Sequence, residues 1–479
     1  MTAISAGVIE RLKAAAGPRG YTDEPAEIAP HLADWRGVYL GASPLLLKPG
    51  STDELARLVA ICRETGTKLV PQGGNTSLVG GSVPFGGGDE IVVSLSRMNR
   101  IRAVDPLDDT ITVEAGCVLS AVQSAAAAAD RLYPLRIASE GSCQIGGVLS
   151  TNAGGTNVLR YGSARSHVLG LEVVLPDGRI WDGLRALRKD NTGYDLKQLF
   201  IGAEGTLGII TAAVLKLHPR PAAVETAIAA VPDPAAALHL LALAQRHSGG
   251  QATACELMPR LGLDFVMRHI AGARELFADR YPWAVLLEFA SSDTGGSLRA
   301  ALEATLSDGL DQGLVADAVI AETIDQARAF WHLRESLPDA QKPEGGSIKC
   351  DIAVPISQTP LFIAEAAAAV EAACAGVRVI AFGHLGDGNI HFNLSQPLGM
   401  DVSAFLARRD EMTTIVHRIT YRFGGSISAE HGLGRLKRDE IKRYKSAVEI
   451  ELMRTLKFAL DPTNMMNPGK LVVPGEGPY

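Results

Sequence analysis

The chain lacks the sequence features that mark several classes of protein. Its six cysteines are scattered and form no CxxC pair, which argues against a disulfide framework and against a cysteine-type zinc or iron–sulfur site. No apolar run reaches the length of about 18 residues that a membrane-spanning helix needs. The N-terminus has no basic region followed by an apolar stretch, so we expect no secretory signal and a cytoplasmic protein.

An excess of positive charge and the common nucleotide motifs are also missing. Lys and Arg number 46 against 53 Asp and Glu, for a net charge of −7, so nothing favours a nucleic acid or an anionic membrane as partner. The sequence contains neither G-x-G-x-x-G nor G-x-x-x-x-G-K-[ST]. A dinucleotide-binding Rossmann site and a P-loop are therefore not supported.

At 479 residues the chain is too long for one ordinary core, and we expect more than one domain. Residues 51–66 predict a helix, because Ser51 is a good N-cap and acids fill the first turn. Residues 119–132 are Ala-rich and predict another. Pro219-Arg220-Pro221 is a plausible hinge, beyond which strands and Ala/Leu-rich helices alternate. Asp233 before Pro234 predicts the start of one of these helices.

Of the 50 glycines, 12 gather in three dense stretches of the N-terminal half, at residues 71–82, 140–155 and 202–210. Consecutive glycines let successive backbone N–H groups point into one concavity, which can hold a diphosphate without a cationic side chain. One such stretch alone could equally be a tight surface loop. Three in one domain cost much backbone entropy, which indicates that a large ligand fills the space between them.

The order of these stretches resembles the FAD domain of the vanillyl-alcohol-oxidase and p-cresol-methylhydroxylase flavoproteins, over roughly residues 38–218. The resemblance implies that the first stretch wraps the FAD pyrophosphate and that the others line the adenosine and isoalloxazine. The cofactor-binding residues that it implies are Pro71, Gly73, Gly74, Asn75, Thr76, Gly80, Gly81, Ser82, Glu140, Gly141, Gly146, Gly147, Asn152, Gly154, Gly155, Gly162, Glu204, Gly208, Ile209 and Asn467.

Family members that bind flavin covalently through the first loop carry His after the Gly-Gly pair. This chain has Asn75 there, and an amide cannot form that bond. We therefore expect FAD to be bound non-covalently.

Two histidine motifs lie far downstream among glycines, at residues 382–393 and 428–434. His384 and His391 flank Asp387-Gly388-Asn389, a strong tight-turn signal. A turn there would bring both imidazoles back toward one point, and Glu430 could add a carboxylate. Such a His₂Glu set with an open fourth position is typical of a catalytic metal site. The alternative for each histidine alone is a satisfied polar side chain at a turn.

These motifs resemble the C-terminal part of the FAD-dependent D-2-hydroxy acid dehydrogenases, and the likeness extends over almost the whole chain. The resemblance implies that His384, His391 and Glu430 hold a divalent metal, with zinc favoured and manganese as the other choice. It implies His431 as the catalytic base. The expected fold is α+β, with a two-part FAD-binding domain of the vanillyl-alcohol-oxidase type and an α+β substrate (cap) domain. We divide it into a helical segment 1–36, the FAD domain 37–220, the substrate domain 221–423 and a returning segment 424–479.

The resemblance implies Arg334 and Lys349 as substrate residues. Asn393 is a third candidate, because it lies two residues beyond His391 and so on the same strand face. An arginine matching Arg334 binds a carboxylate in many members, and a lysine matching Lys349 is typical of the D-2-hydroxyglutarate branch. The alternative for both is a solvated surface charge. Many members also have Thr four residues after this arginine, where this chain has Pro338. The lysine favours D-2-hydroxyglutarate as the substrate that is oxidised. Because Pro338 offers no hydroxyl, D-malate, D-lactate and glycolate are left open.

Other readings differ in function. The histidine set alone would allow a flavin-free zinc hydrolase, which leaves the glycine stretches unexplained. A non-redox flavoprotein of the same fold, such as alkyl-dihydroxyacetone-phosphate synthase, and a non-catalytic flavin-binding protein are further alternatives. As electron acceptor we expect an electron-transfer flavoprotein rather than a quinone. A homodimer is left open.

Overall fold

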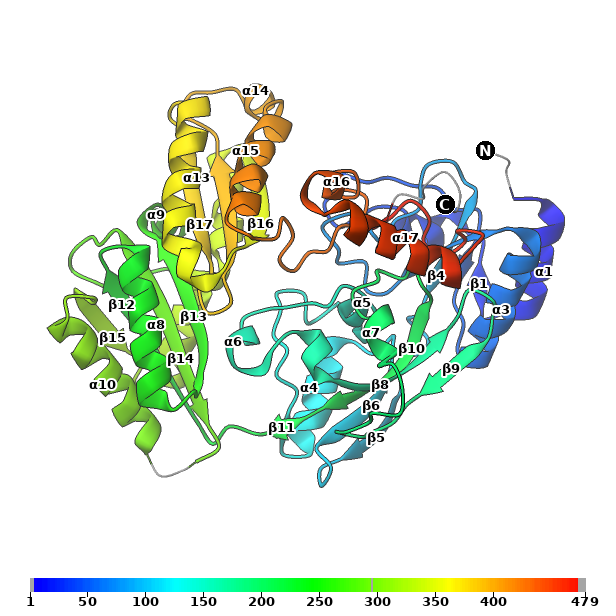
Figure 1. The fold of residues 1–479 in the computed structure, drawn as a ribbon, viewed down its shortest axis with the longest axis horizontal. Coiled ribbons are helices and arrows are strands. Elements are labelled where there is room, and N and C mark those ends of the chain that lie inside the picture. The colour runs from blue at the N-terminus through cyan, green and yellow to red at the C-terminus, as the bar shows by residue number, and fades with distance from the viewer. Residues whose placement is uncertain (1–3, 294–295, 473–479) are drawn as a thin grey trace. The chain divides into compact units, whose positions relative to one another are not determined.

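The computed structural model describes residues 4–293 and 296–472, which form two compact units (Figure 1). Of the described residues, 4–153, 163–219 and 430–472 form unit 1, and 154–162, 220–293 and 296–429 form unit 2. The last seven residues of the predicted segment 424–479 lie outside the described part. Among the described residues, no helix is both long and apolar enough to cross a bilayer.

Unit 1 is built on two main sheets. The first has the order β1-β2-β4-β3, in which β1–β2 is antiparallel and β2–β4 and β4–β3 are parallel, and the second has the order β5-β6-β10-β8-β9 and is antiparallel throughout. The strands of unit 1 are β1 Tyr21–Thr22, β2 Leu46–Leu47, β3 Lys68–Gln72, β4 Glu90–Ser94, β5 Ile101–Asp105, β6 Thr110–Glu114, β7 Arg131–Leu132, β8 Val168–Val174, β9 Ile180–Gly183, β10 Ile209–Lys216 and β11 His218–Pro219. Its helices are α1 Ala6–Ala16, α2 Pro25–Ile28, η1 Ala29–His31, α3 Thr52–Thr65, α4 Leu119–Ala128, α5 Ile145–Ser150, η2 Ala164–His167, α7 Lys197–Phe200, α16 Ile441–Tyr444 and α17 Ala447–Leu460.

One of the two helices predicted in the N-terminal half is confirmed, and the other ends earlier than predicted. Helix α3 begins after Ser51, whose side chain accepts the N–H of Glu54, and ends at Gly66 in the left-handed conformation, as predicted. Helix α4 ends at Ala128, so the prediction of a helix to residue 132 was wrong. Asp130 takes a φ of 55°, which no helix interior accommodates, and the next two residues form strand β7.

Two domain assignments differ from the sequence-based division. The described residues 4–36 of the predicted N-terminal segment group with unit 1, where strand β1 pairs with β2 in the first sheet, and residues 1–3 of that segment lie outside the described part. Residues 154–162, placed in the FAD domain from the sequence, group with unit 2. The boundary after Pro219 coincides with the predicted hinge.

Unit 2 contains one antiparallel sheet of seven strands in the order β15-β12-β14-β13-β17-β18-β16. The strands are β12 Ala223–Val231, β13 Ala252–Pro259, β14 Trp283–Ser291, β15 Asp317–Ile320, β16 Ser347–Ala353, β17 Arg378–His384 and β18 Asn389–Ser395. The helices are α6 Val158–Tyr161, α8 Pro234–Ser248, α9 Arg260–His269, α10 Ser297–Asp311, α11 Ile324–Glu335, α12 Leu337–Ala340, η3 Lys342–Glu344, η4 Ile356–Gln358, α13 Thr359–Ala373, α14 Val402–Leu406 and α15 Arg409–Arg422. Helix α8 begins after Asp233, as predicted, and the Asp233 carboxylate accepts the N–H of Ala236 at 2.8 Å.

The two faces of this sheet are covered by different helices. Alternate strand residues pack with α8, α10, α13 and α15 into the larger core, which includes Leu257, Val285 and Phe392 (Figure 1). The opposite face packs with α9, α11 and α12 around residues such as Phe382 and Trp331. Because side chains alternate between faces, Glu256, His384 and His391 share the second face.

In unit 1 the first and second glycine-rich stretches pack closely together. A Cβ added to Gly74 would lie 2.1 Å from the carbonyl oxygen of Ser142 and 2.9 Å from the Cα of Cys143. Both neighbours are backbone atoms, which cannot move aside cheaply. The close approach therefore requires glycine at this position.

We expect Gly74→Ala to lower the free energy of unfolding by about 1–3 kcal/mol, the usual cost of overpacking. The effect is read as a fall in melting temperature. Gly86→Ala is the matched control, because nothing lies within 4 Å of a Cβ at Gly86. Equal melting temperatures for the two variants would show that the loops can separate without cost.

Candidate functional site

The three glycine-rich stretches converge within unit 1. Gly73 lies against Gly147 of the second stretch, and Gly81 lies against the carboxylate of Glu204 in the third. The N–H of Glu204 donates to the carbonyl of Ser150 at 2.8 Å. These contacts bring loops from three parts of the sequence to one place, as a single large ligand would require.

Polar side chains hold the first loop in shape. The Asn75 amide donates to the carbonyl of Ala33 at 2.8 Å and accepts from the Ser82 hydroxyl at 2.9 Å. The Asn467 amide donates to the carbonyls of Gly81 and Glu204, at 2.9 and 2.8 Å. These residues were predicted to bind the cofactor. The contacts described above lie within the protein, so that role stays a prediction.

Glu204 anchors the C-terminal segment of unit 1. Its buried carboxylate accepts the backbone N–H groups of Leu433 and Gly434, at 2.7 and 2.8 Å. Burial raises the pKa of Glu204, and these two N–H groups act in the opposite direction. The sequence predicted a contact to FAD for this residue. The structure gives its carboxylate to the loop that follows His431.

The remaining predicted cofactor residues of unit 1 lie in or beside the three stretches. Asn152 takes a positive φ and accepts from the Ser163 hydroxyl at 3.0 Å. Ile209 opens strand β10 and is buried in the core. The others lie on strand β3, in the loops or in helix α5, and are Pro71, Thr76, Gly80, Glu140, Gly141, Gly146 and Gly208.

Part of the second glycine stretch belongs to unit 2. Gly154, Gly155 and Gly162 border helix α6, which packs on strand β13. The side chain of Leu159 in this helix would lie 2.8 Å from a Cβ on Gly386. Gly386 sits in the turn between His384 and His391. The predicted flavin-binding segment therefore touches the turn that carries the histidines, within one unit.

The predicted turn joins strands β17 and β18 into a hairpin. His384 ends β17, and His391 lies on β18 opposite Phe382. The two imidazole rings have centroids 5.5 Å apart, and one ring nitrogen of each lies within 4.8 Å of the other. The hairpin thus brings together the two side chains that the sequence predicted as metal ligands.

A buried carboxylate that the sequence analysis missed lies beside His384. Glu256 on strand β13 is directly opposite His384 on β17. Its Oε1 lies 2.8 Å from Nδ1 of His384, and its Oε2 accepts from Nε of Arg334 at 2.7 Å. Arg334 is 5% exposed, so the alternative of a solvated surface charge was wrong for this residue. The one acid in the apolar strand 252–259 was the available signal, because an unpaired buried charge is rare.

The charges around Glu256 determine its ionisation. Burial opposes the charged form, but the charges of His384 and Arg334 and their hydrogen bonds hold the pKa of Glu256 at about 2. The Arg334 guanidinium carbon also lies 4.9 Å from the centre of the Phe382 ring. Glu256 is therefore an ionised acceptor at neutral pH.

Acidic and amide side chains surround His391. Nδ1 of His391 lies 3.8 Å from Asp351, its cross-strand neighbour on β16. The Asn389 amide donates to Asp351 at 2.9 Å. Asp351 is thereby fixed beside the second histidine.

The two other predicted substrate residues face each other on neighbouring strands. Lys349 on β16 pairs with Asn393 on β18, on the same face as His391. Lys349 is exposed, whereas Asn393 is buried and its amide donates to Oε1 of Gln341 at 3.1 Å. Gln341, also missed from the sequence, donates in turn to the carbonyl of Leu337 at 2.8 Å.

Glu430 and His431 lie where the chain passes from unit 2 into unit 1. Nε2 of His431 is 3.7 Å from a carboxylate oxygen of Glu430. The preceding residue, Ala429, belongs to unit 2, and its N–H points to the carbonyl of Asp351 at 3.4 Å.

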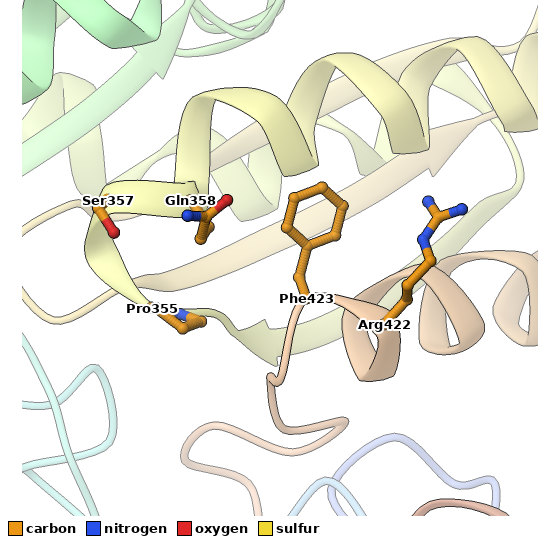
Figure 2. A pocket seen from close by; sticks show the side chains of 5 residues that line it. All are labelled: Pro355, Ser357, Gln358, Arg422 and Phe423. Atoms are coloured by element: carbon orange, nitrogen blue, oxygen red, sulfur yellow. The ribbon is translucent and has the colours of Figure 1, made fainter.

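Figure 2 shows a separate hollow of about 530 Å³ in unit 2. It is lined by Pro355, Ser357, Gln358, Arg422 and Phe423. None of the predicted site residues lines it, so it does not take part in the chemistry considered below.

The residues present fit both implied groups. Imidazole nitrogens are good ligands for zinc and other first-row divalent metals, and the paired ring nitrogens of His384 and His391 are close enough to share one ion. Nothing lies within 4 Å of a Cβ placed on Gly141 or Gly147, so the second glycine stretch leaves space beside its backbone, which suits a dinucleotide diphosphate.

Two family models match the chain. Residues 43–183 match the FAD binding domain, and residues 220–471 match the C-terminal domain of FAD linked oxidases. A mitochondrial D-2-hydroxyglutarate dehydrogenase of Arabidopsis thaliana is 38% identical over 95% of this chain and 80% of its own length. The D-2-hydroxyglutarate dehydrogenase of Xanthomonas citri is 37% identical over 95% of this chain and 94% of its own.

Solved structures show the same fold at low identity. A p-cresol methylhydroxylase with bound substrate has a TM-score of 0.76 at 16% identity, covering 99% of both chains. An alkyldihydroxyacetonephosphate synthase has a TM-score of 0.74 at 20% identity, covering 97% of this chain and 85% of its own. The predicted α+β fold is confirmed. The chain belongs to the FAD-linked oxidase family of the vanillyl-alcohol-oxidase/p-cresol-methylhydroxylase type and is an FAD-dependent oxidoreductase.

Proposed function

We propose that this protein is an FAD- and metal-dependent dehydrogenase that oxidises a D-2-hydroxy acid, with D-2-hydroxyglutarate favoured, to the 2-oxo acid. The observation that carries the proposal is the His384–His391 hairpin, which presents two metal-ligand nitrogens in a chain whose relatives are D-2-hydroxyglutarate dehydrogenases. Helix α6, continuous with a glycine-rich flavin segment, packs against the turn of that hairpin.

We assign Glu430 as the third metal ligand. The residue before it, Ala429, is positioned by Asp351, and Asp351 is the cross-strand neighbour of His391. One peptide bond separates Glu430 from that anchor. The ligand set is then His₂Glu with an open position for substrate. Zinc is the favoured ion and manganese the alternative.

The chemistry divides among a few side chains. FAD, when bound, would supply the hydride acceptor for C2 of the substrate, and a divalent ion held by His384, His391 and Glu430 would lower the pKa of the substrate hydroxyl. His431 takes the hydroxyl proton, which an imidazole can do near neutral pH. Arg334 and Lys349 bind the distal carboxylate. The electrons then leave to a separate acceptor, with an electron-transfer flavoprotein preferred to a quinone.

The position of Lys349 favours a dicarboxylate. Lys349 pairs with Asn393, two residues along β18 from His391, which is about 7 Å at the usual rise per residue. A second carboxylate a few carbons from C2 would reach the Lys349 ammonium. D-malate fits this description as well as D-2-hydroxyglutarate, whereas D-lactate and glycolate have no such group.

The flavin is expected to be non-covalent, because Asn75 occupies the position of the attaching histidine. Acid precipitation should therefore release essentially all of the yellow colour into the supernatant. Flavin fluorescence that migrates with the denatured polypeptide on a gel would contradict this.

We expect His391→Ala to lower bound metal well below one ion per chain and to reduce turnover by at least about a hundredfold. FAD absorbance should be retained, since the hairpin lies in unit 2 and the anchoring loops lie mainly in unit 1. Metal analysis and a dye-coupled assay measure the two effects. His247→Ala is the control, because this histidine pairs with Asp308 away from the hairpin. Full activity in a metal-free His391→Ala protein would refute the metal role.

Lys349→Met should reduce kcat/KM for D-2-hydroxyglutarate and D-malate about ten- to a hundredfold, because a charge-assisted hydrogen bond contributes about 1.5–3 kcal/mol. Turnover of D-lactate is the internal control. Lys342→Met is the matched variant, since Lys342 pairs with Asp339 at 2.7 Å. An equal fall for mono- and dicarboxylates would assign Lys349 to the C1 end or to structure. If kcat/KM changes for neither class of substrate, Lys349 is a solvated surface charge without a role in binding.

A further inference from the structure

The hydrogen-bonding capacity of Glu256 is shared between two groups of the proposed site. Its carboxylate lies between Nδ1 of His384 at 2.8 Å and Nε of Arg334 at 2.7 Å. Glu256 is 1% exposed, and His384 and Arg334 are 7% and 5% exposed. Water therefore has little access to replace either contact. The three side chains come from β13, β17 and α11 and are held by packing of the sheet.

The chemistry of the contact decides which nitrogen of His384 carries the hydrogen. An ionised carboxylate can only accept hydrogen bonds, so Nδ1 must carry the hydrogen that it receives. In a neutral imidazole the other nitrogen, Nε2, then keeps its lone pair. A metal ligand must offer such a lone pair, and carboxylate partners of this kind fix the tautomer and ring orientation of metal-binding histidines.

The same carboxylate fixes the guanidinium of Arg334. Its Nε–H is accepted by Oε2, and the guanidinium carbon lies 4.9 Å from the centre of the Phe382 ring. With Nε engaged and the plane set against the ring, the terminal nitrogens point in a fixed direction. Arginine recognises carboxylates with such a preset fork.

We propose that Glu256 is a positioning residue that sets the metal-binding tautomer of His384 and the orientation of Arg334 at once. This inference rests on the proposed function. It assigns to one buried carboxylate the alignment of the ligand at the reacting end of the substrate and of the cation at its distal end.

Glu256→Gln tests the assignment with almost no change in shape. Glutamine has one acceptor oxygen, whereas two donors, Nδ1–H and Nε–H, need acceptors. Either the His384 proton moves to Nε2, which blocks metal binding, or Arg334 loses its partner. We expect the affinity for zinc to fall about 10- to 100-fold, measured without turnover by chelator competition on FAD-loaded protein. The KM for D-2-hydroxyglutarate should rise about tenfold.

Glu288→Gln is the matched control. Glu288 lies on the neighbouring strand β14 and accepts from the Trp331 indole at 2.6 Å and from Thr253 at 3.0–3.3 Å through its backbone and side chain. Its exchange should leave zinc affinity unchanged. If Glu256 has only a structural role, Glu256→Gln will lower the melting temperature and leave the zinc affinity at the value of Glu288→Gln. That result overturns the inference.

Should Glu256→Gln fail to yield FAD-loaded protein, Glu256→Asp replaces it, because it keeps the charge but falls one methylene short of the ring. A loss of zinc affinity of at least about threefold is then expected, and wild-type affinity overturns the inference. The two proposals fail differently. If wild-type protein binds zinc and Glu256→Gln binds it equally, only the role of Glu256 falls. If wild-type protein binds no divalent metal, the proposed function loses its metal and this inference falls with it.

Discussion

The antiparallel register of strands β13, β17 and β18 is the constraint on which the rest of the site depends. It places Glu256 opposite His384 and Phe382 opposite His391. A shift of one residue would send these side chains to the opposite face, among the apolar residues of the larger core. Apolar packing on both faces therefore locks the register. Hydrophobic packing of the sheet therefore determines where the two histidines lie.

The same packing makes the polar residues of this face costly unless each has a partner. Glu256 satisfies His384 and Arg334, and Gln341 satisfies Asn393 while donating to Leu337. Removing one partner from such a buried set leaves an uncompensated charge or amide. The network therefore holds few alternative arrangements. Rigidity of this kind is what a site needs to present ring nitrogens and a guanidinium in fixed directions.

Local signals could be predicted from the sequence, and long-range ones could not. Ser51 and Asp233 predicted the start of their helices, because a cap acts within one turn of the helix. Asp387-Gly388-Asn389 predicted the hairpin, because a tight turn is also set by neighbouring residues. Glu256 was missed because its partners lie 128 and 78 residues away, a pairing that only the sheet order reveals. The helix predicted to extend to residue 132 was too long, because helix propensity does not reveal that Asp130 takes a positive φ.

The course of the chain explains why residues 154–162, placed in the FAD domain from the sequence, group with unit 2. The backbone passes between the units around residues 154–162, at Pro219 and at Glu430. The first passage carries predicted flavin residues and packs Leu159 on Gly386, and the last carries Glu430 and His431 directly after the anchored Ala429. Beyond the last passage, the buried Glu204 fixes the backbone at Leu433 and Gly434. Ala429 is therefore anchored within unit 2 and Leu433 within unit 1, and each of these anchors lies two residues from His431 along the chain.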